Sequence, residues 1–207
     1  MNEFIKILTR VLSRFFPKLE PKQEQIKTVT PEIIRNPEPV VLEYNLPKKL
    51  EMKWHPPIHL EKFTVTQKFL TPDSGNYPKT GHHPGTDYGT QGKDNIPLYF
   101  CADGEVIESG NNHKYFGNYF FYYVPEAAKT FAYFHLRDAA PVRGQYKVGE
   151  QCGVTGNTGL SFGPHLHLEC IHGRKTSADR ASLYTSKVAL EAAAEDADDF
   201  IRPRLVN

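Results

Sequence analysis

Two short segments of the chain carry side chains that could bind a metal ion. The first, His83-Pro84-Gly85-Thr86-Asp87, places an imidazole four residues before a carboxylate. Both groups are good ligands for first-row metals. Gly85 would let the backbone between them turn tightly, so that the two side chains converge. A His-x-x-x-Asp spacing often arises by chance, so the segment gains meaning only together with the second one.

The second segment, His165-Leu166-His167-Leu168-Glu169, alternates polar and apolar residues. In a β-strand, this period places the two histidines and Glu169 on one face while the leucines enter the core. Histidines at positions i and i+2 can then reach one metal region, one as a ligand and one as a neighbour. Two solvated strand histidines are the alternative, but that interpretation leaves the preceding Gly163-Pro164 turn and the upstream Asp87 unexplained.

A third segment, Tyr133-Phe134-His135-Leu136, also has the pattern of a strand. The alternation predicts that Tyr133 and His135 share a face. A lone histidine on such a strand is more often structural than functional, so His135 gains weight only from the other two segments. His82 lies next to His83, and spacing alone does not decide which of the two pairs with Asp87.

The composition describes the kind of domain that must position these residues. Its 207 residues suffice for one domain with extensions, and 39% hydrophobic with 24% charged residues permits a packed core. A net charge of +1 gives no indication of a nucleic-acid partner. The 13 Phe and 11 Tyr favour aromatic-rich β structure. Three cysteines without a CxxC pair are best explained as buried apolar residues.

Short alternating segments separated by Gly, Asn, Asp and Pro predict a mainly β fold with an antiparallel sheet. The predicted strands are Phe63–Leu70, Thr86–Gly89, Pro97–Phe100, Gly104–Ser109, Tyr119–Val124, Thr130–His135 and Leu166–Ile171. The Ala-rich stretch Ser186–Ala197 predicts a short C-terminal helix. The organisation is therefore predicted as an amphipathic helix over 1–16, a Pro-rich arm over 17–57, a globular domain over 58–180 and a helical tail over 181–207.

The N-terminal segment 1–16 has apolar residues at helical spacing. Lys6, Arg10 and Arg14 interrupt it every four residues, so it lacks the uncharged core of a cleavable signal peptide. No run approaches the ~18 apolar residues of a transmembrane helix. An amphipathic helix of this kind could contact a membrane surface or a protein partner, or could pack on its own domain.

The three segments together resemble the lysostaphin-type, LytM-domain zinc endopeptidases, a family of peptidoglycan hydrolases. That family has a His-x-Gly-x-Asp motif, a Tyr-x-His-Leu segment and a Gly-Pro-His-Leu-His motif. The corresponding residues here are His83–Asp87, Tyr133–Leu136 and Gly163–His167. The stretch Ile96–Val106 is also similar to a strand and turn of the family, and the resemblance covers roughly Phe63 to Cys170.

The resemblance implies a metal site with one zinc ion per chain, held by His83, Asp87 and His167. It selects His83 over His82, because the glycine of the motif falls at Gly85 only when His83 is the ligand. The implied fold is the antiparallel β fold of these peptidases, similar to a duplicated hybrid motif, with the metal site in a groove.

The resemblance also implies that His135 and His165 are catalytic. The chain has no HExxH motif, so the glutamate base of other zinc peptidases is missing. An imidazole can exchange a proton near neutral pH, and we expect His165 nearer the base role and His135 nearer charge stabilisation. The connection between His135 and the Gly156-Asn157-Thr158-Gly159 turn is shorter than usual, so the loops around the groove are expected to differ.

The implied function is hydrolysis of an amide bond in peptidoglycan, in the stem peptide or the cross-bridge, and hence action at the bacterial cell wall, in the periplasm or outside the cell. A bacteriophage lysin or a virion-associated wall hydrolase fits the missing signal peptide, and we favour it over a bacterial protein attached through residues 1–16. The alternatives are a non-catalytic LytM-like wall-binding or regulatory protein and a structural component of an assembly. All five functional positions are present, which favours the enzyme.

Overall fold

The computed structural model describes residues 54–205 and contains one large antiparallel sheet. Its strands lie in the order β1-β2-β9-β6-β5-β4-β7, with β10 paired to β9. The bounds are β1 Thr64–Gln67, β2 Thr86–Gly89, β4 Gly104–His113, β5 Gly117–Val124, β6 Lys129–Leu136, β7 Gly144–Tyr146, β9 His165–His172 and β10 Ala194–Glu195. The prediction of a mainly antiparallel β fold is confirmed.

A second, two-stranded sheet covers one face of the large one. It pairs β3, Pro97–Tyr99, with β8, Gln151–Val154. Between the two sheets lies the main core, rich in aromatic rings. In it Phe120 stacks on Tyr133 with ring centroids 4.5 Å apart, and both side chains are fully buried. The three cysteines are free and buried, as the sequence predicts.

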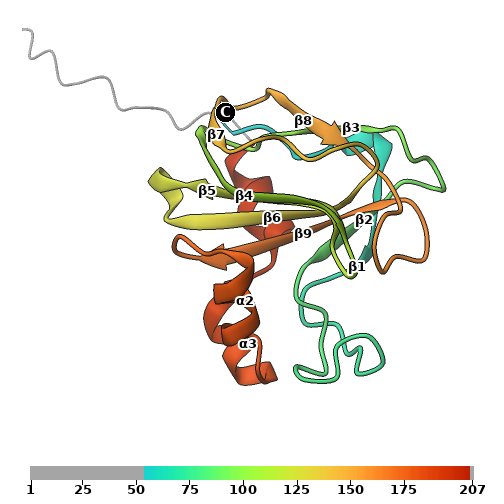
Figure 1. The fold of residues 1–207 in the computed structure, drawn as a ribbon, viewed down its shortest axis with the longest axis vertical. Helices are drawn as coiled ribbons and strands as arrows, with labels where there is room; N and C mark the ends of the chain where they lie inside the picture. Colours follow the sequence, from blue (N-terminus) through green and yellow to red (C-terminus); the bar gives the residue numbers. More distant parts are fainter. Residues whose placement is uncertain (1–53, 206–207) are drawn as a thin grey trace, which may run out of the picture. The chain divides into compact units, whose positions relative to one another are not determined.

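Short helices occupy the C-terminal part of the described chain. They are α2 Ser177–Leu183, α3 Lys187–Ala193 and α4 Ala197–Ile201, and single 3-10 turns span Leu60–Lys62, Pro125–Ala127 and Arg202–Arg204. Each α-helix begins at a polar cap, because a side-chain oxygen of Thr176, Ser186 or Asp196 accepts from the free N–H groups of its first turn. Figure 1 shows α2 and α3 on the side of the large sheet opposite to β3 and β8.

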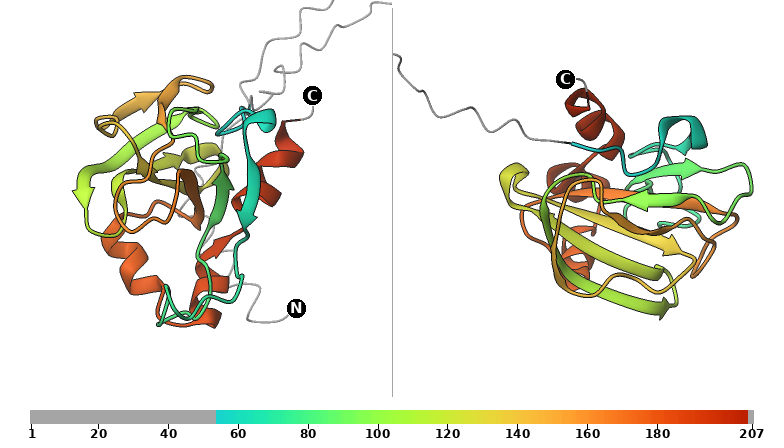
Figure 2. Two further views of the ribbon diagram at one scale, coloured as in Figure 1. Left: turned by 90° about the vertical axis from the view of Figure 1, so that its right-hand side faces the viewer. Right: turned by 90° about the horizontal axis from the view of Figure 1, so that it is seen from above.

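The last helix packs beside the first described residues, as Figure 2 shows. Phe200 of α4 contacts Trp54, with ring centroids 5.6 Å apart, and both rings pack near Phe131 of β6. The first and the last described segments of the chain therefore pack together against the same face of the large sheet. None of the helices among residues 54–205 is long and apolar enough to cross a membrane.

Most predicted strands match observed ones within a few residues, and β2 matches at both ends. The prediction missed β7 and β8, which are short. The single helix predicted over Ser186–Ala197 is instead two helices, because the chain between them pairs with β9 as β10. The amphipathic helix over 1–16 and most of the arm over 17–57 lie outside the described residues, and the domain limits stay predictions.

Candidate metal centre and active site

Three side-chain donor atoms converge on one point between β2 and β9. Nε2 of His83 lies 3.3 Å from Oδ1 of Asp87 and 3.1 Å from Nδ1 of His167, and Nδ1 of His167 lies 2.8 Å from Oδ1 of Asp87. Among the described residues this is the one group of three or more such side chains whose donors come close enough to hold a metal ion. The structure brings His83, rather than the adjacent His82, to Asp87.

Strand pairing sets this arrangement. Asp87 and His167 are direct partners in the β2–β9 ladder, so their side chains project from one face of the sheet at neighbouring positions. His83 lies just before β2. Its main chain pairs with the segment after β1, since Leu70 N–H donates to the His83 carbonyl at 2.9 Å. Its ring Nδ1 donates to the carbonyl of Lys68 at 3.2 Å, which leaves Nε2 toward the cluster.

Gly85 is needed in the His-Pro-Gly-Thr-Asp motif for a reason that differs from the predicted one. Gly85 is not among the residues with positive φ, so a special backbone conformation does not explain it. A Cβ atom at this position would instead lie 2.6 Å from the Leu168 carbonyl oxygen and 2.8 Å from Nε2 of His167. The absence of a side chain therefore lets the segment before β2 approach β9 closely.

The donor set and its geometry fit a zinc ion. Two imidazole nitrogens and one carboxylate oxygen are typical zinc ligands, with metal–ligand distances near ~2.0–2.2 Å, and a tetrahedron of that size has edges of about 3.4 Å. The three donors are 2.8–3.3 Å apart, slightly closer than those edges. His83 and His167 are buried, whereas Asp87 is partly exposed at the floor of a groove. Three ligands with one open side are typical of a catalytic site.

The charges at this point are strongly coupled. Burial opposes ionisation of Asp87, but hydrogen bonds from His167 and His83 outweigh it and hold the pKa of the carboxyl well below its usual range. Burial likewise disfavours the cationic form of His167, yet its hydrogen bonds to Asp87 and Glu169 raise its pKa to about 9. The ionised carboxylates around His167 therefore favour a positive charge at this point. A bound divalent cation can supply that charge in place of the proton.

His135 belongs to the same site, but it does not lie where the alternation predicts. Tyr133 points into the main core, whereas Phe134 and His135 both line the groove, so Tyr133 and His135 do not share a face. The reason is a left-handed backbone at His135, with φ of 65°. This conformation breaks the period of the strand, and the His135 N–H donates to the Phe116 carbonyl instead of continuing the regular ladder.

His135 and His165 are held in the same way. Nδ1 of His135 donates to the Thr158 carbonyl at 2.7 Å, and Nδ1 of His165 donates to the Gly163 carbonyl at 2.8 Å. In each neutral ring, Nε2 is then left as an acceptor. Nε2 of His165 lies 3.6 Å from Oδ1 of Asp87, and the centroids of the His135 and His165 rings are 4.8 Å apart.

Burial also favours the neutral form of both rings. It lowers the pKa of His135 to about 3, with further lowering from His167 and His165. Burial also lowers the pKa of His165, although Asp87 and the Gly163 carbonyl oppose that shift. Near neutral pH these two imidazoles are therefore uncharged and able to accept a proton at Nε2.

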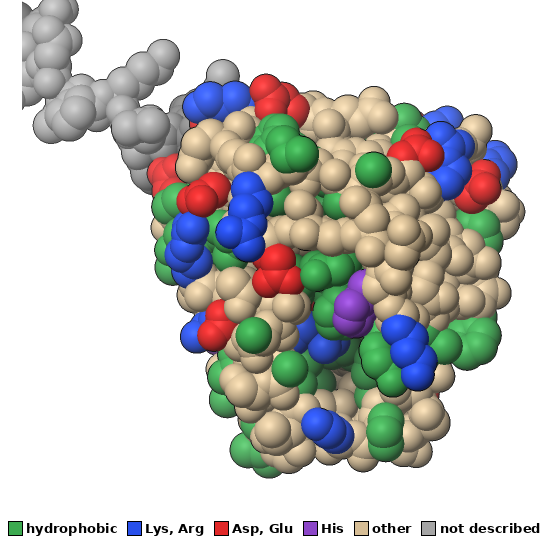
Figure 3. Space-filling model, viewed as in Figure 1, with side chains coloured by type: hydrophobic (Ala, Val, Ile, Leu, Met, Phe, Trp, Pro, Cys, Tyr) green, Lys and Arg blue, Asp and Glu red, His purple; other side chains and the backbone are tan. Residues whose placement is uncertain are grey.

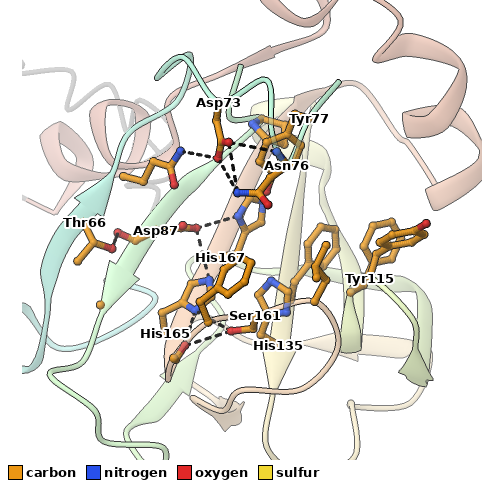
Figure 4. A pocket seen from close by; sticks show the side chains of 18 of the residues that line it. Thr66, Asp73, Asn76, Tyr77, Asp87, Tyr115, His135, Ser161, His165 and His167 are labelled. Carbon is orange, nitrogen blue, oxygen red and sulfur yellow. Dashed lines mark hydrogen bonds and ion pairs between the residues drawn. The ribbon is translucent and has the colours of Figure 1, made fainter. Parts of the chain in front are cut away.

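A groove of about 1030 Å³ opens over the cluster. Figure 3 shows it as a hollow with a histidine side chain at its edge, and Figure 4 shows His135, His165, His167 and Asp87 pointing toward one another at its floor. One rim is apolar and exposed, and it consists of Tyr115, Leu160 and Phe162, which are 52%, 48% and 85% exposed. An extended chain could lie in this groove across the cluster.

Sequence reasoning missed two residues under the cluster. The strand pattern puts Glu169 on the same face as the histidines but assigns it no role, and it does not single out Arg180. Nε2 of His167 donates to Oε1 of Glu169 at 3.1 Å, and Arg180 donates to the same carboxylate. Burial opposes ionisation of Glu169, but Arg180 outweighs it and lowers the pKa to about 2. The position of Glu169, two residues after His167, was the available signal, whereas nothing local pointed to Arg180.

The comparison with known families identifies the same region of the chain. The sequence model of Peptidase family M23 matches residues 81–179. The peptidoglycan DD-endopeptidase ShyA of Vibrio cholerae is 39% identical over 106 residues, which is 49% of this chain and 23% of the relative. The peptidoglycan DD-endopeptidase ShyB of the same organism is 33% identical over 136 residues, 61% of this chain and 31% of the relative.

The matched parts thus span less than a third of these curated relatives. Among solved structures, the antimicrobial peptidase lysostaphin from Staphylococcus simulans aligns with a TM-score of 0.55 over 73% of this chain and 54% of that chain, at 19% identity. At that identity, the likeness establishes a shared fold. The shared fold and the family match therefore identify the same part of the chain, which contains all three motifs.

Proposed function

We propose that the chain is a zinc-dependent endopeptidase that hydrolyses an amide bond in peptidoglycan, on the premise that residues 81–179, which the model of Peptidase family M23 matches, form a domain of that family. The observation that carries the proposal is the convergence of three metal-binding donors with two further histidines on the floor of one groove. A non-catalytic wall-binding protein would not need a base-competent imidazole pair beside a complete ligand set.

In the proposed site, His83, Asp87 and His167 hold one zinc ion per chain. A bound zinc ion supplies a Lewis acid that polarises a carbonyl and makes water more acidic. The fixed distances among the donors, 2.8–3.3 Å, mean that little reorganisation of the protein is needed for binding. The groove side of the cluster stays open for the substrate.

The proton transfers are assigned to His165 and His135. We place His165 nearer the base role, because its Nε2 lies 3.6 Å from Asp87 and so borders the cluster. It takes the proton of the attacking water, and that proton passes to the nitrogen of the leaving amine as the amide C–N bond breaks. His135, held by Thr158 on the other side, is assigned to stabilising charge on the scissile carbonyl oxygen, a role in which its Nε2 must carry a proton and donate a hydrogen bond.

The class of bond is taken from the relatives. ShyA and ShyB are named peptidoglycan DD-endopeptidases, and we propose the same class here, an internal peptide bond between D-configured residues of the wall. The substrate implies action at the bacterial cell wall. The proposed virion-associated or phage-lysin role, and the membrane or protein partner of residues 1–16, stay predictions, because the described residues and the named relatives do not bear on them.

The proposal is tested by digesting purified peptidoglycan with the full chain and resolving the soluble fragments by mass spectrometry. We expect loss of cross-linked fragments and a matching gain of monomeric stem peptides. A metal chelator should stop the reaction, and added zinc should restore it. Unchanged fragments with the zinc-loaded chain would refute the assignment, and cleavage that persists in excess chelator would refute the zinc dependence.

A further inference from the structure

The residues behind the metal centre form an ordered series that runs from His167 through Glu169 to Arg180, which lines the groove. The ring of His167 uses both nitrogens: Nδ1 faces Asp87 and His83, and Nε2 donates to Oε1 of Glu169 at 3.1 Å. Glu169 lies two residues further along β9 on the same face and is fully buried. A buried carboxylate without a partner would be costly, so the structure must compensate its charge.

Arg180 of α2 supplies that compensation. Its Nε lies 2.9 Å and 2.7 Å from the two oxygens of Glu169, and Nη2 donates to Oε1 as well. The guanidinium lies over the ring of Tyr184 at 4.6 Å, of Phe116 at 5.2 Å and of Phe134 at 5.6 Å. A planar fork stacked among aromatic rings is held in orientation as well as in position.

One of these aromatic side chains, Phe134, also contacts the metal-binding ring of His167 directly. Phe134 stacks flat on the ring of His167, with centroids 5.3 Å apart and an interplanar angle of 2°. The helix that carries Arg180 is in turn fixed at its start, because Thr176 and Asp179 form a capping box and the Ser177 N–H donates to Glu108 at 3.0 Å. Arg180 lies one residue beyond the segment matched to the peptidase family.

We infer that Glu169 and Arg180 are positioning residues of the metal centre: Arg180 fixes the Glu169 carboxylate, which fixes the ring of His167 with Nδ1 toward Asp87 and His83. This inference rests on the proposed metal centre. Hydrogen bonds of this kind fix both the tautomer and the orientation of a metal-binding histidine. Because Arg180 belongs to α2 and is itself among the residues that line the groove, the C-terminal part of the described chain contributes to the site.

The test compares zinc affinity, measured by competition with a chromophoric chelator, in the full chain and in Glu169→Gln and Arg180→Lys. We expect Glu169→Gln to weaken zinc binding about 10–100-fold. Arg180→Lys keeps the charge but loses the planar, forked guanidinium, and we expect it to weaken zinc binding by a smaller factor, at least threefold.

The matched control is Glu105→Gln. It breaks a bidentate pair with Arg174, at 2.8 and 3.0 Å, that is partly exposed and lies on β4, outside the groove lining, so it should leave the affinity unchanged.

A second readout separates positioning from general stability. In the zinc-loaded chain, the His167 ring N–H should give a slowly exchanging ¹H–¹⁵N signal that shifts in Glu169→Gln and stays in place in Glu105→Gln. If Glu169→Gln does not fold, Arg180→Lys carries the comparison. Wild-type zinc affinity in both site variants would overturn the inference while the wild-type chain still binds zinc and cleaves the wall. A wild-type chain that binds no zinc would overturn both the inference and the proposed function.

Discussion

Apart from His135, the residues of β2, β6 and β9 alternate between the two faces of the sheet, and these faces have different roles. On one face, apolar side chains such as Leu166 and Leu168 pack into the aromatic core. On the other, His167 and Glu169 are equally buried, but each polar atom that points inward meets a partner. The first face contributes stability through apolar burial. The second face holds ionisable groups in a fixed arrangement. A catalytic or metal-binding site requires such an arrangement, whereas an apolar core does not.

The largest expected effect is on the site face. His167→Ala removes the donor shared by Asp87 and His83, so we expect loss of zinc and a fall of wall-hydrolysing activity to the level of a reaction without enzyme. Metal content of the purified chain and release of soluble wall fragments measure the two effects. Activity that survives this substitution would mean that the cluster on this face is not the reactive centre.

A separation of binding from turnover comes next. His135→Ala leaves the three ligands in place, so zinc should stay bound while the hydrolysis rate falls about 10²–10³-fold, the range for loss of one group that stabilises charge on the carbonyl oxygen. His172→Ala, an exposed histidine at the end of the same β9 strand, is the control and should keep full activity. Equal rates for the two variants would remove His135 from the mechanism.

The core face should respond in the opposite sense. Leu168→Ala, next to His167 but fully buried in the main core, should lower the free energy of unfolding by about 2–5 kcal/mol. The folded fraction should still bind zinc with nearly wild-type affinity. Denaturant unfolding of the metal-free chain and a zinc titration measure the two quantities. A large loss of affinity with little loss of stability would show that the faces are not independent.

A smaller effect is expected from a substitution where the segment before β2 approaches β9 closely. Gly85→Ala adds a Cβ atom 2.6 Å from the Leu168 carbonyl oxygen, so we expect a loss of about 1–3 kcal/mol of stability from overpacking, together with weaker zinc binding. Gly163→Ala is the matched control, since nothing lies within 4 Å of a Cβ there. Similar thermal unfolding and zinc affinity for both variants would contradict the steric account.

The smallest effect is expected at the rim. Phe162→Ser changes a side chain that is 85% exposed, so the stability and the zinc content should stay as in the wild type. If the substrate covers this ring, the KM for soluble wall fragments should rise by up to about tenfold, with kcat nearly unchanged. A changed kcat would mean that this rim acts on the cluster rather than on the substrate.

The sequence predicted what depends on local pattern. Alternation placed His165 and His167 on one face of β9, and chelating spacing suggested Asp87. The prediction that Tyr133 and His135 share a face was wrong, because nothing in Tyr133-Phe134-His135 indicates the left-handed backbone conformation at His135. The sequence also failed to indicate Arg180, since its contact with Glu169 depends on how α2 packs against β9. Tertiary packing, rather than local pattern, decides such a partner.

The most direct test of the central claim is the zinc stoichiometry of three purified chains: wild type, His83→Ala and His82→Ala. These adjacent histidines differ in the structure, because His83 faces Asp87, whereas Nδ1 of His82 bonds the Thr80 carbonyl at 2.9 Å. We predict one zinc ion per chain for the wild type and for His82→Ala, and none for His83→Ala. Zinc retained by His83→Ala and lost from His82→Ala would contradict the assignment.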